Sequence, residues 1–114
     1  MPTILISNDI HERLIANGSR SAAGEDIDPV PVVKLFTLDA NATWLLTELD
    51  EDKIALGLCD LGLGSPELGY VAISEIVSLR RPLGLPVERD EHYAETRPIS
   101  LIVRAARQAG QLNV

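Results

Sequence analysis

The chain has 114 residues and a formal net charge of −7 at pH 7. This length predicts one folded domain over residues 1–114. With 17 acidic against 10 basic residues, the chain is poorly suited to direct binding of a nucleic-acid backbone, which requires clustered positive charge. The same charge permits binding to a protein with a basic surface, and it also favours solubility without any partner.

Cysteine content and hydropathy indicate the compartment. Cys59 is the only cysteine, so an internal disulfide is excluded. We recognise no secretory signal at the start of the sequence, and no apolar run approaches the ~20 residues of a membrane span. We therefore expect a cytoplasmic protein that makes no membrane contact.

The first helix is expected over residues 8–17. Ser7 is suited to cap its start, and Asn17-Gly18 is suited to end it. Residues 19–31 are polar and contain Gly and Pro, so we expect an exposed loop there.

Four strand-length apolar runs follow, at residues 32–38, 43–50, 54–60 and 68–73. The links between them are too short for parallel crossovers, so consecutive strands must pair antiparallel. Between the last two strands, Gly62 and Gly64 are free to adopt positive φ, and Pro66 fixes its own φ. We expect a shaped turn here; two glycines one residue apart also permit an anion-binding loop.

Two further helices are expected, over residues 74–80 and 98–109. The segment 83–93 between them is interpreted as extended, with a short edge strand near Val87 as an option. The predicted fold is α+β: a four-stranded antiparallel meander sheet with three helices packed on it.

The predicted core follows from the inward positions of these elements. Trp44 has two interpretations, as a core residue or as an interface anchor. The second face of the sheet, which includes Trp44, Leu46 and Phe36, is too apolar to be wholly hydrated, so a helix or a partner chain should cover it. The predicted core residues are Val33, Leu35, Leu45, Leu56, Leu58, Val71, Ile73, Ile102 and Ala106.

Five short motifs are spread along the chain, at residues 32–36 (Val-Val-Lys-Leu-Phe), 43–50 (Thr-Trp-Leu-Leu-Thr-Glu-Leu-Asp), 57–62 (Gly-Leu-Cys-Asp-Leu-Gly), 66–71 (Pro-Glu-Leu-Gly-Tyr-Val) and 83–90 (Leu-Gly-Leu-Pro-Val-Glu-Arg-Asp). In this order they resemble an uncharacterised bacterial family, the domain-of-unknown-function family 2958. The resemblance covers nearly the whole chain. It implies no catalytic residue and only a setting, because the family is found in Proteobacteria, often on plasmids and other mobile elements.

A candidate binding rim is expected where the turn after residue 60 meets the charged segment 88–93. Arg89 should pair there with Asp60 or Glu67, because an unpaired charge is costly in a partly buried site. The alternative is that segment 88–93 is simply a solvated edge. The predicted rim residues are Asp60, Glu67, Arg89, Asp90, His92 and Tyr93.

Catalytic and metal chemistry receive little support. Cys59 beside Asp60 could act as a nucleophile, but no cation or helix N-terminus adjoins it in sequence to lower its pKa, so a small buried cysteine is favoured. The chain has two His and one Cys, without the short paired spacing that zinc sites use. We predict no metal site and no cofactor.

Three functions remain open. The first is a non-enzymatic accessory protein of mobile elements that binds a protein of host defence, in an anti-restriction or anti-CRISPR manner, or of DNA processing. The second is a small enzyme using Asp60, Glu67, Asp90 and His92. The third is a structural module that forms a homodimer through its sheet.

Overall fold

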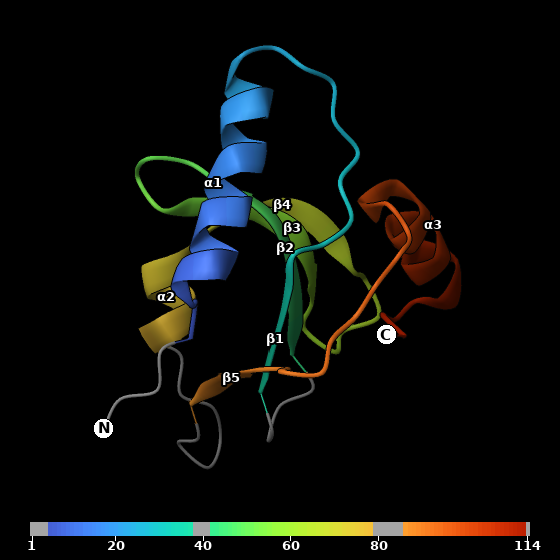
Figure 1. Cartoon of the computed structure of the whole chain (residues 1–114). Helices are drawn as coiled ribbons and strands as arrows, with labels where there is room; N and C mark the ends of the chain where they lie inside the picture. The colour runs from blue at the N-terminus through green and yellow to red at the C-terminus, as the bar shows by residue number, and fades with distance from the viewer. Residues whose placement is uncertain (1–4, 38–41, 79–85, 114) are drawn as a thin grey trace.

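The structure is a computed structural model that describes residues 5–37, 42–78 and 86–113. Within these residues, one five-stranded sheet lies between helices: α1 and α2 are on one side and α3 is on the other (Figure 1). The fold is α+β with three layers. Its elements are, in chain order, α1 (Asn8–Ala22), β1 (Val33–Thr37), β2 (Thr43–Leu49), β3 (Ile54–Asp60), β4 (Glu67–Ala72), α2 (Ile73–Ser78), β5 (Val87–Arg89) and α3 (Ile99–Ala109).

The sheet is antiparallel throughout, with the strand order β4-β3-β2-β1-β5. The predicted meander of β1 to β4 is confirmed in order and pairing. The prediction of four strands is wrong by one, because β5 pairs with the outer side of β1, placing Arg89 opposite Leu35. A strand of three residues carries too little periodicity for sequence to do more than suggest it.

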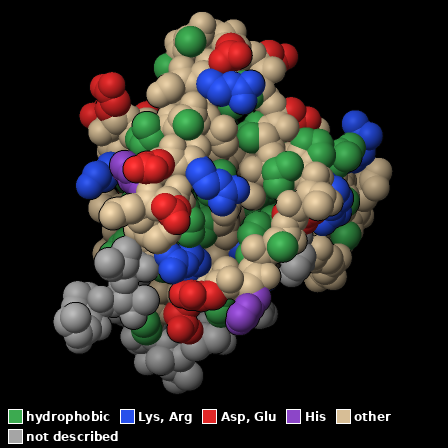
Figure 2. All heavy atoms as spheres, viewed as in Figure 1, with side chains coloured by type: hydrophobic (Ala, Val, Ile, Leu, Met, Phe, Trp, Pro, Cys, Tyr) green, Lys and Arg blue, Asp and Glu red, His purple; other side chains and the backbone are tan. Residues whose placement is uncertain are grey.

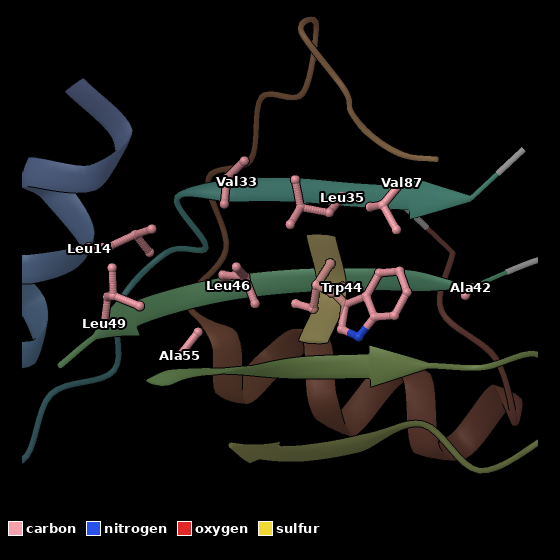
Figure 3. Close-up of a cluster of buried hydrophobic side chains, with 10 residues drawn as sticks. Leu14, Val33, Leu35, Ala42, Trp44, Leu46, Leu49, Ala55 and Val87 are labelled. Carbon is pink, nitrogen blue, oxygen red and sulfur yellow. The ribbon is translucent and has the colours of Figure 1, made fainter. Parts of the chain in front are cut away.

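The two sides of the sheet hold separate groups of buried side chains. On the α3 side, Leu45 and Leu58 pack against that helix. On the side of α1 and α2 lies the larger group, and within it the Trp44 indole extends from β2 towards β3 among aliphatic side chains (Figure 3). Trp44 is therefore a core residue, and of the two expected covers for its face, a helix or a partner chain, the described residues show helices. Phe36 was wrongly expected on this face: its neighbour Leu35 pairs with Trp44, so Phe36 points to the other side. This larger group, on the side of α1 and α2, comprises Leu14, Val33, Leu35, Ala42, Trp44, Leu46, Leu49, Ala55, Ile76 and Val87.

Most of the predicted core is buried, but Leu56, Val71 and Ile73 are only half-buried. Leu56 is outside the group that packs on α3. Val71 lies on β4, the outermost strand, and Ile73 follows that strand directly. The confirmed core residues are Val33, Leu35, Leu45, Leu58, Ile102 and Ala106.

The first helix continues past the predicted stop at Asn17-Gly18 and ends at Ala22. Asn17 Nδ2 donates to the Thr47 carbonyl at 2.9 Å, and a Cβ on Gly18 would overlap the Leu49 carbonyl oxygen. These two residues therefore bring α1 close to β2 instead of ending the helix. The start is as predicted, because Ser7 Oγ accepts from the Ile10 amide at 3.4 Å.

The first turn of helix α3 is capped by a residue that is distant in sequence, Asp28. Pro98 occupies the N-cap position and provides no side-chain cap. Instead, Asp28 accepts hydrogen bonds from the amide of Ser100, at 3.0 Å, and from its hydroxyl, so the loop after α1 is tied to the last helix. Gly110, with φ 72°, ends α3 as predicted.

Candidate functional site

The predicted rim does not form as one site. Glu67 lies on β4 and Arg89 on β5, which are opposite edges of the sheet. Glu67 and Arg89 are the two ends of one cross-strand row that runs through β3, β2 and β1. Four inter-strand spacings therefore separate their backbones, a distance of roughly 19 Å. Arg89 instead donates to the Leu5 carbonyl at 3.0 Å and pairs with Glu91 at 3.2 Å. The predicted pairing of Arg89 with Asp60 or Glu67 is therefore wrong, because a fifth strand carries the segment to the far edge.

Asp60 is buried, and it stabilises the turn and the end of the chain. Its Oδ1 accepts from the Gly62 amide and its Oδ2 from the Leu112 amide, both at 2.8 Å. Gly62 and Gly64 have φ of 77° and 84°, as the predicted turn requires. Since the Gly62 amide already donates to a carboxylate, the turn does not present that donor to an anion.

The charged segment after β5 is folded on itself and onto α3. Asp90 pairs with Lys34 at 3.6 Å and accepts from the His92 amide at 2.9 Å, while the His92 side chain is exposed. Tyr93 packs against the group of buried residues on α3. Burial, and then the charge of Glu95, raise the pKa of Tyr93 to about 12, with Arg97 opposing them. Tyr93 thus contributes to packing on the α3 side, and a binding role for this edge remains a prediction.

Among the residues that the structure describes, no positively charged group lowers the pKa of Cys59. Burial raises the pKa of its thiol, and the charges of Asp60 and Glu67 raise it further, so the unreactive neutral form is favoured at pH 7. Among the described residues, no group of three or more His, Cys, Asp or Glu side chains is arranged to hold a metal ion.

Sequence reasoning missed a hollow beside the outermost strand, which we call the β4 groove. It has a volume of about 370 Å³. Gly57 of β3 and Gly69 of β4 are paired directly across the ladder, and Ile76 of α2 forms part of the wall. The small residues of β3 were the signal in the sequence that could have indicated it. The lining residues are Trp44, Leu46, Gly57, Cys59, Leu61, Glu67, Leu68, Gly69, Tyr70, Val71, Glu75 and Ile76.

The strand beside this groove is open along its outer side. In the described sheet, β4 is an edge strand, paired only with β3. Its Leu68 is 40% exposed and its Tyr70 74% exposed, and Leu61 and Leu63 of the preceding turn are exposed as well. Single exposed apolar residues are ordinary, but Leu61, Leu68 and Tyr70 line the same groove, and such a group of exposed apolar residues is of the kind that marks interaction sites.

Negative charge borders the β4 groove. Glu67 and Glu75 are both exposed residues of its lining, and within the described residues neither forms an ion pair. On the face shown in Figure 2, by contrast, acidic and basic side chains are interspersed. That view therefore shows no continuous acidic surface. The carboxylates without an ion-pair partner among the described residues, Glu67 and Glu75, lie beside the groove.

None of the helices in residues 5–37, 42–78 and 86–113 is both long enough and apolar enough to span a membrane.

Comparison with known proteins identifies the family. The curated proteins and the solved structures contain no match to the chain. A family model described as a protein of unknown function (DUF2958) matches residues 5–113. The chain therefore belongs to the family DUF2958, as its motifs indicated.

Proposed function

We propose that this protein is a non-enzymatic accessory protein that acts by binding another protein at β4. The observation that carries the proposal is an edge strand with exposed Leu68 and Tyr70 beside an apolar groove. Unpaired strand edges are templates for association, and proteins commonly shorten, charge or cover them. This strand has six residues with Glu67 as its one charge, which is little protection for a surface that has no partner.

The partner that fits is a protein with a basic surface. The chain carries −7 overall, and Glu67 and Glu75 border the groove, so electrostatic complementarity would speed encounter and select cationic partners. Following the family resemblance, we place the protein in the cytoplasm of bacteria that carry plasmids or other mobile elements. Host-defence and DNA-processing proteins, whose basic surfaces hold nucleic acid, are the partner classes that this setting suggests.

The enzyme hypothesis has less support. Both oxygens of Asp60 already accept backbone hydrogen bonds. His92 follows β5, at the edge of the sheet opposite Glu67. The residues proposed to act together are therefore held apart by the sheet. The homodimer hypothesis keeps support from the same open strand, and the experiment below separates it from binding to a different protein.

In-cell photo-crosslinking tests the proposal. A benzophenone amino acid placed at Leu68, which is 40% exposed on β4, should yield adducts with one other protein in the native host. The same probe at Leu101, which is 43% exposed on α3, is the matched control and should yield none. Equal adducts at the two positions, or none at Leu68, would contradict the proposal. Adducts only with the protein itself would support the homodimer.

A further inference from the structure

We propose that the β4 edge binds an extended segment of the partner protein as an additional strand, with a long aliphatic side chain in the β4 groove and Lys or Arg on either side of it. This inference deepens the proposed function and rests on it. Strand addition of this kind draws affinity from main-chain hydrogen bonds and specificity from pockets for alternate side chains. The strand edge, the groove and the charge each support one part of the proposal.

The main-chain part follows from the sheet order. The outer side of β4 has no strand partner in the described sheet, so alternate amide and carbonyl groups along its six residues point away from β3. The opposite edge offers much less, because β5 has three residues. An added strand would therefore find a long template at β4 and a short one at β5.

The side-chain part follows from the paired glycines. Gly69 and Gly57 face each other on the side of the sheet that holds Trp44. A Cβ built on Gly69 would meet nothing within 4 Å, so the space above this position is open. A residue opposite Gly69 on an added strand would point to the same face and would reach over it into the groove. The volume of about 370 Å³ accommodates a Leu or Met side chain.

The flanking charges follow from the neighbouring positions. Residues two places before and after the aliphatic residue would lie on the same face, beside Glu67 at one end and near Glu75 of α2 at the other. Since neither carboxylate has an ion-pair partner among the described residues, Lys or Arg fits both. The alternate residues of the segment would cover Leu68 and Tyr70 on the other face.

A second copy of the chain is a poorer occupant. If two β4 strands paired antiparallel about Gly69, each Glu67 would face Val71 of the other copy, so no cation would reach the carboxylates. Pairing would also bring together two chains that each carry −7. Charge complementarity therefore favours a cationic segment over self-association.

A synthetic peptide tests the geometry directly. The probe is a fluorescein-labelled peptide of sequence Thr-Lys-Val-Leu-Val-Lys-Thr, blocked at both ends, with binding followed by fluorescence anisotropy. We expect saturable binding that weakens with added salt. Replacing both Lys by Glu, or the central Leu by Asp, should weaken it at least about tenfold. Absence of saturable binding, or indifference to these replacements, overturns the inference.

Two N-methylated versions of the peptide test strand addition itself. A strand uses alternate amides to pair with one neighbour. Methylation of the alternate amides that point towards β4 should therefore abolish binding. Methylation of the other amides, which point away from β4, should leave binding nearly unchanged. Equal effects of the two sets would show that the peptide binds the groove without joining the sheet.

A variant of the protein supplies the complementary test. Gly69→Leu places a side chain where the aliphatic residue would enter, in space that is open, so the variant should fold and lose peptide binding. Ala105→Leu, at an exposed position of α3, is the matched control and should bind as the wild type does. Circular dichroism confirms that both variants fold. Binding retained by the folded Gly69→Leu variant overturns the inference.

Two outcomes separate this inference from the proposed function. If crosslinking at Leu68 captures a partner but Gly69→Leu does not diminish the capture, protein binding stands and strand addition fails. If sedimentation shows a dimer that Gly69→Leu converts to a monomer, the occupant is a second copy, and the proposed cationic segment is wrong.

Discussion

Gly57 of β3 and Gly69 of β4 lie directly opposite each other in the antiparallel ladder. The two positions differ in what a side chain would meet. A Cβ on Gly57 would overlap the carbonyl oxygen of Leu45, whereas a Cβ on Gly69 would meet nothing. The fold therefore requires glycine at one side of this pair, while at the other side the absence of a side chain keeps the groove open.

The first prediction compares these two glycines. Gly57→Ala should lower the free energy of unfolding by about 1–3 kcal/mol, because the backbone must shift to admit the methyl group. Gly69→Ala should leave stability equal or slightly higher, since it adds a side chain in open space and restricts the unfolded chain. Urea denaturation of the two variants and the wild type checks both; equal losses would contradict the geometry.

The second prediction concerns the packing of α3 on the sheet. Leu58 is fully buried in the group beneath α3, so Leu58→Ala should cost about 2–5 kcal/mol of unfolding free energy. Leu63→Ala is the matched control, since Leu63 is 81% exposed and should change stability by less than about 0.5 kcal/mol. A loss well under 1 kcal/mol at Leu58 would mean that its side chain is misplaced.

The third prediction is a pH dependence. Hydrogen bonds from Arg97 lower the pKa of Glu95 from 4.5 to about 2. Because the folded pKa lies below the ordinary value, the stabilisation is fully present above pH 4.5 and is lost as the pH falls towards 2.

Thermal unfolding of an Arg97→Gln variant tests this assignment. The difference in Tm between wild type and Arg97→Gln should be largest above pH 4.5 and should shrink as the pH falls to about 2. Arg104→Gln, which changes an exposed arginine of α3, should show no such narrowing. A difference independent of pH would assign the effect of Arg97 to something other than Glu95.

The fourth prediction concerns the reactivity of Cys59. Its raised pKa should make alkylation by iodoacetamide slower than that of a free cysteine at neutral pH and faster as the pH rises. Glu67→Gln removes one of the charges that raise this pKa, so it should speed the reaction. Glu12→Gln on α1, at an exposed position, should not. Measuring the rate over a range of pH shows whether the pKa itself has moved.

The fifth prediction is that the isolated protein has negligible affinity for DNA or RNA at physiological salt. With 17 acidic and 10 basic residues, the chain would lose more by charge repulsion than it gains from phosphate contacts. An electrophoretic shift assay with duplex and single-stranded probes checks this. Tight, salt-sensitive retardation would contradict it.

Much of the fold was predictable because local signals agree with the tertiary structure. The strand-length runs and short links predicted β1 to β4 and their antiparallel order, and the caps Ser7 and Gly110 marked helix ends correctly. Asn17-Gly18 misled us because the same residues that end helices also allow a helix to approach a strand closely. Only the neighbouring backbone of Leu49 distinguishes the two uses.

The candidate site was less predictable, because it depends on where strands lie in the sheet and not on their own sequences. Placing Arg89 beside Asp60 assumed that the chain returns to the β3–β4 end, whereas β5 joins the opposite edge. Tyr93 was expected at an interface but packs against α3. A double substitution of Arg89 and Tyr93 should therefore lower the melting temperature. Sequence alone did not show that β4 would be left with an open side.

Helix α3 follows every strand of the described sheet in sequence, and it covers Leu45 and Leu58 of β2 and β3. During translation the entire sheet is synthesised before this helix, so one face of the sheet has no cover while the ribosome completes the remaining residues. Asp28 and Asp60 are also synthesised earlier than Ser100 and Leu112, whose amides donate hydrogen bonds to them. These two carboxylates therefore lack those hydrogen bonds until the later residues are made. A nascent chain stalled before residue 99 should therefore present bare apolar surface to chaperones, and release of the finished helix should end that exposure.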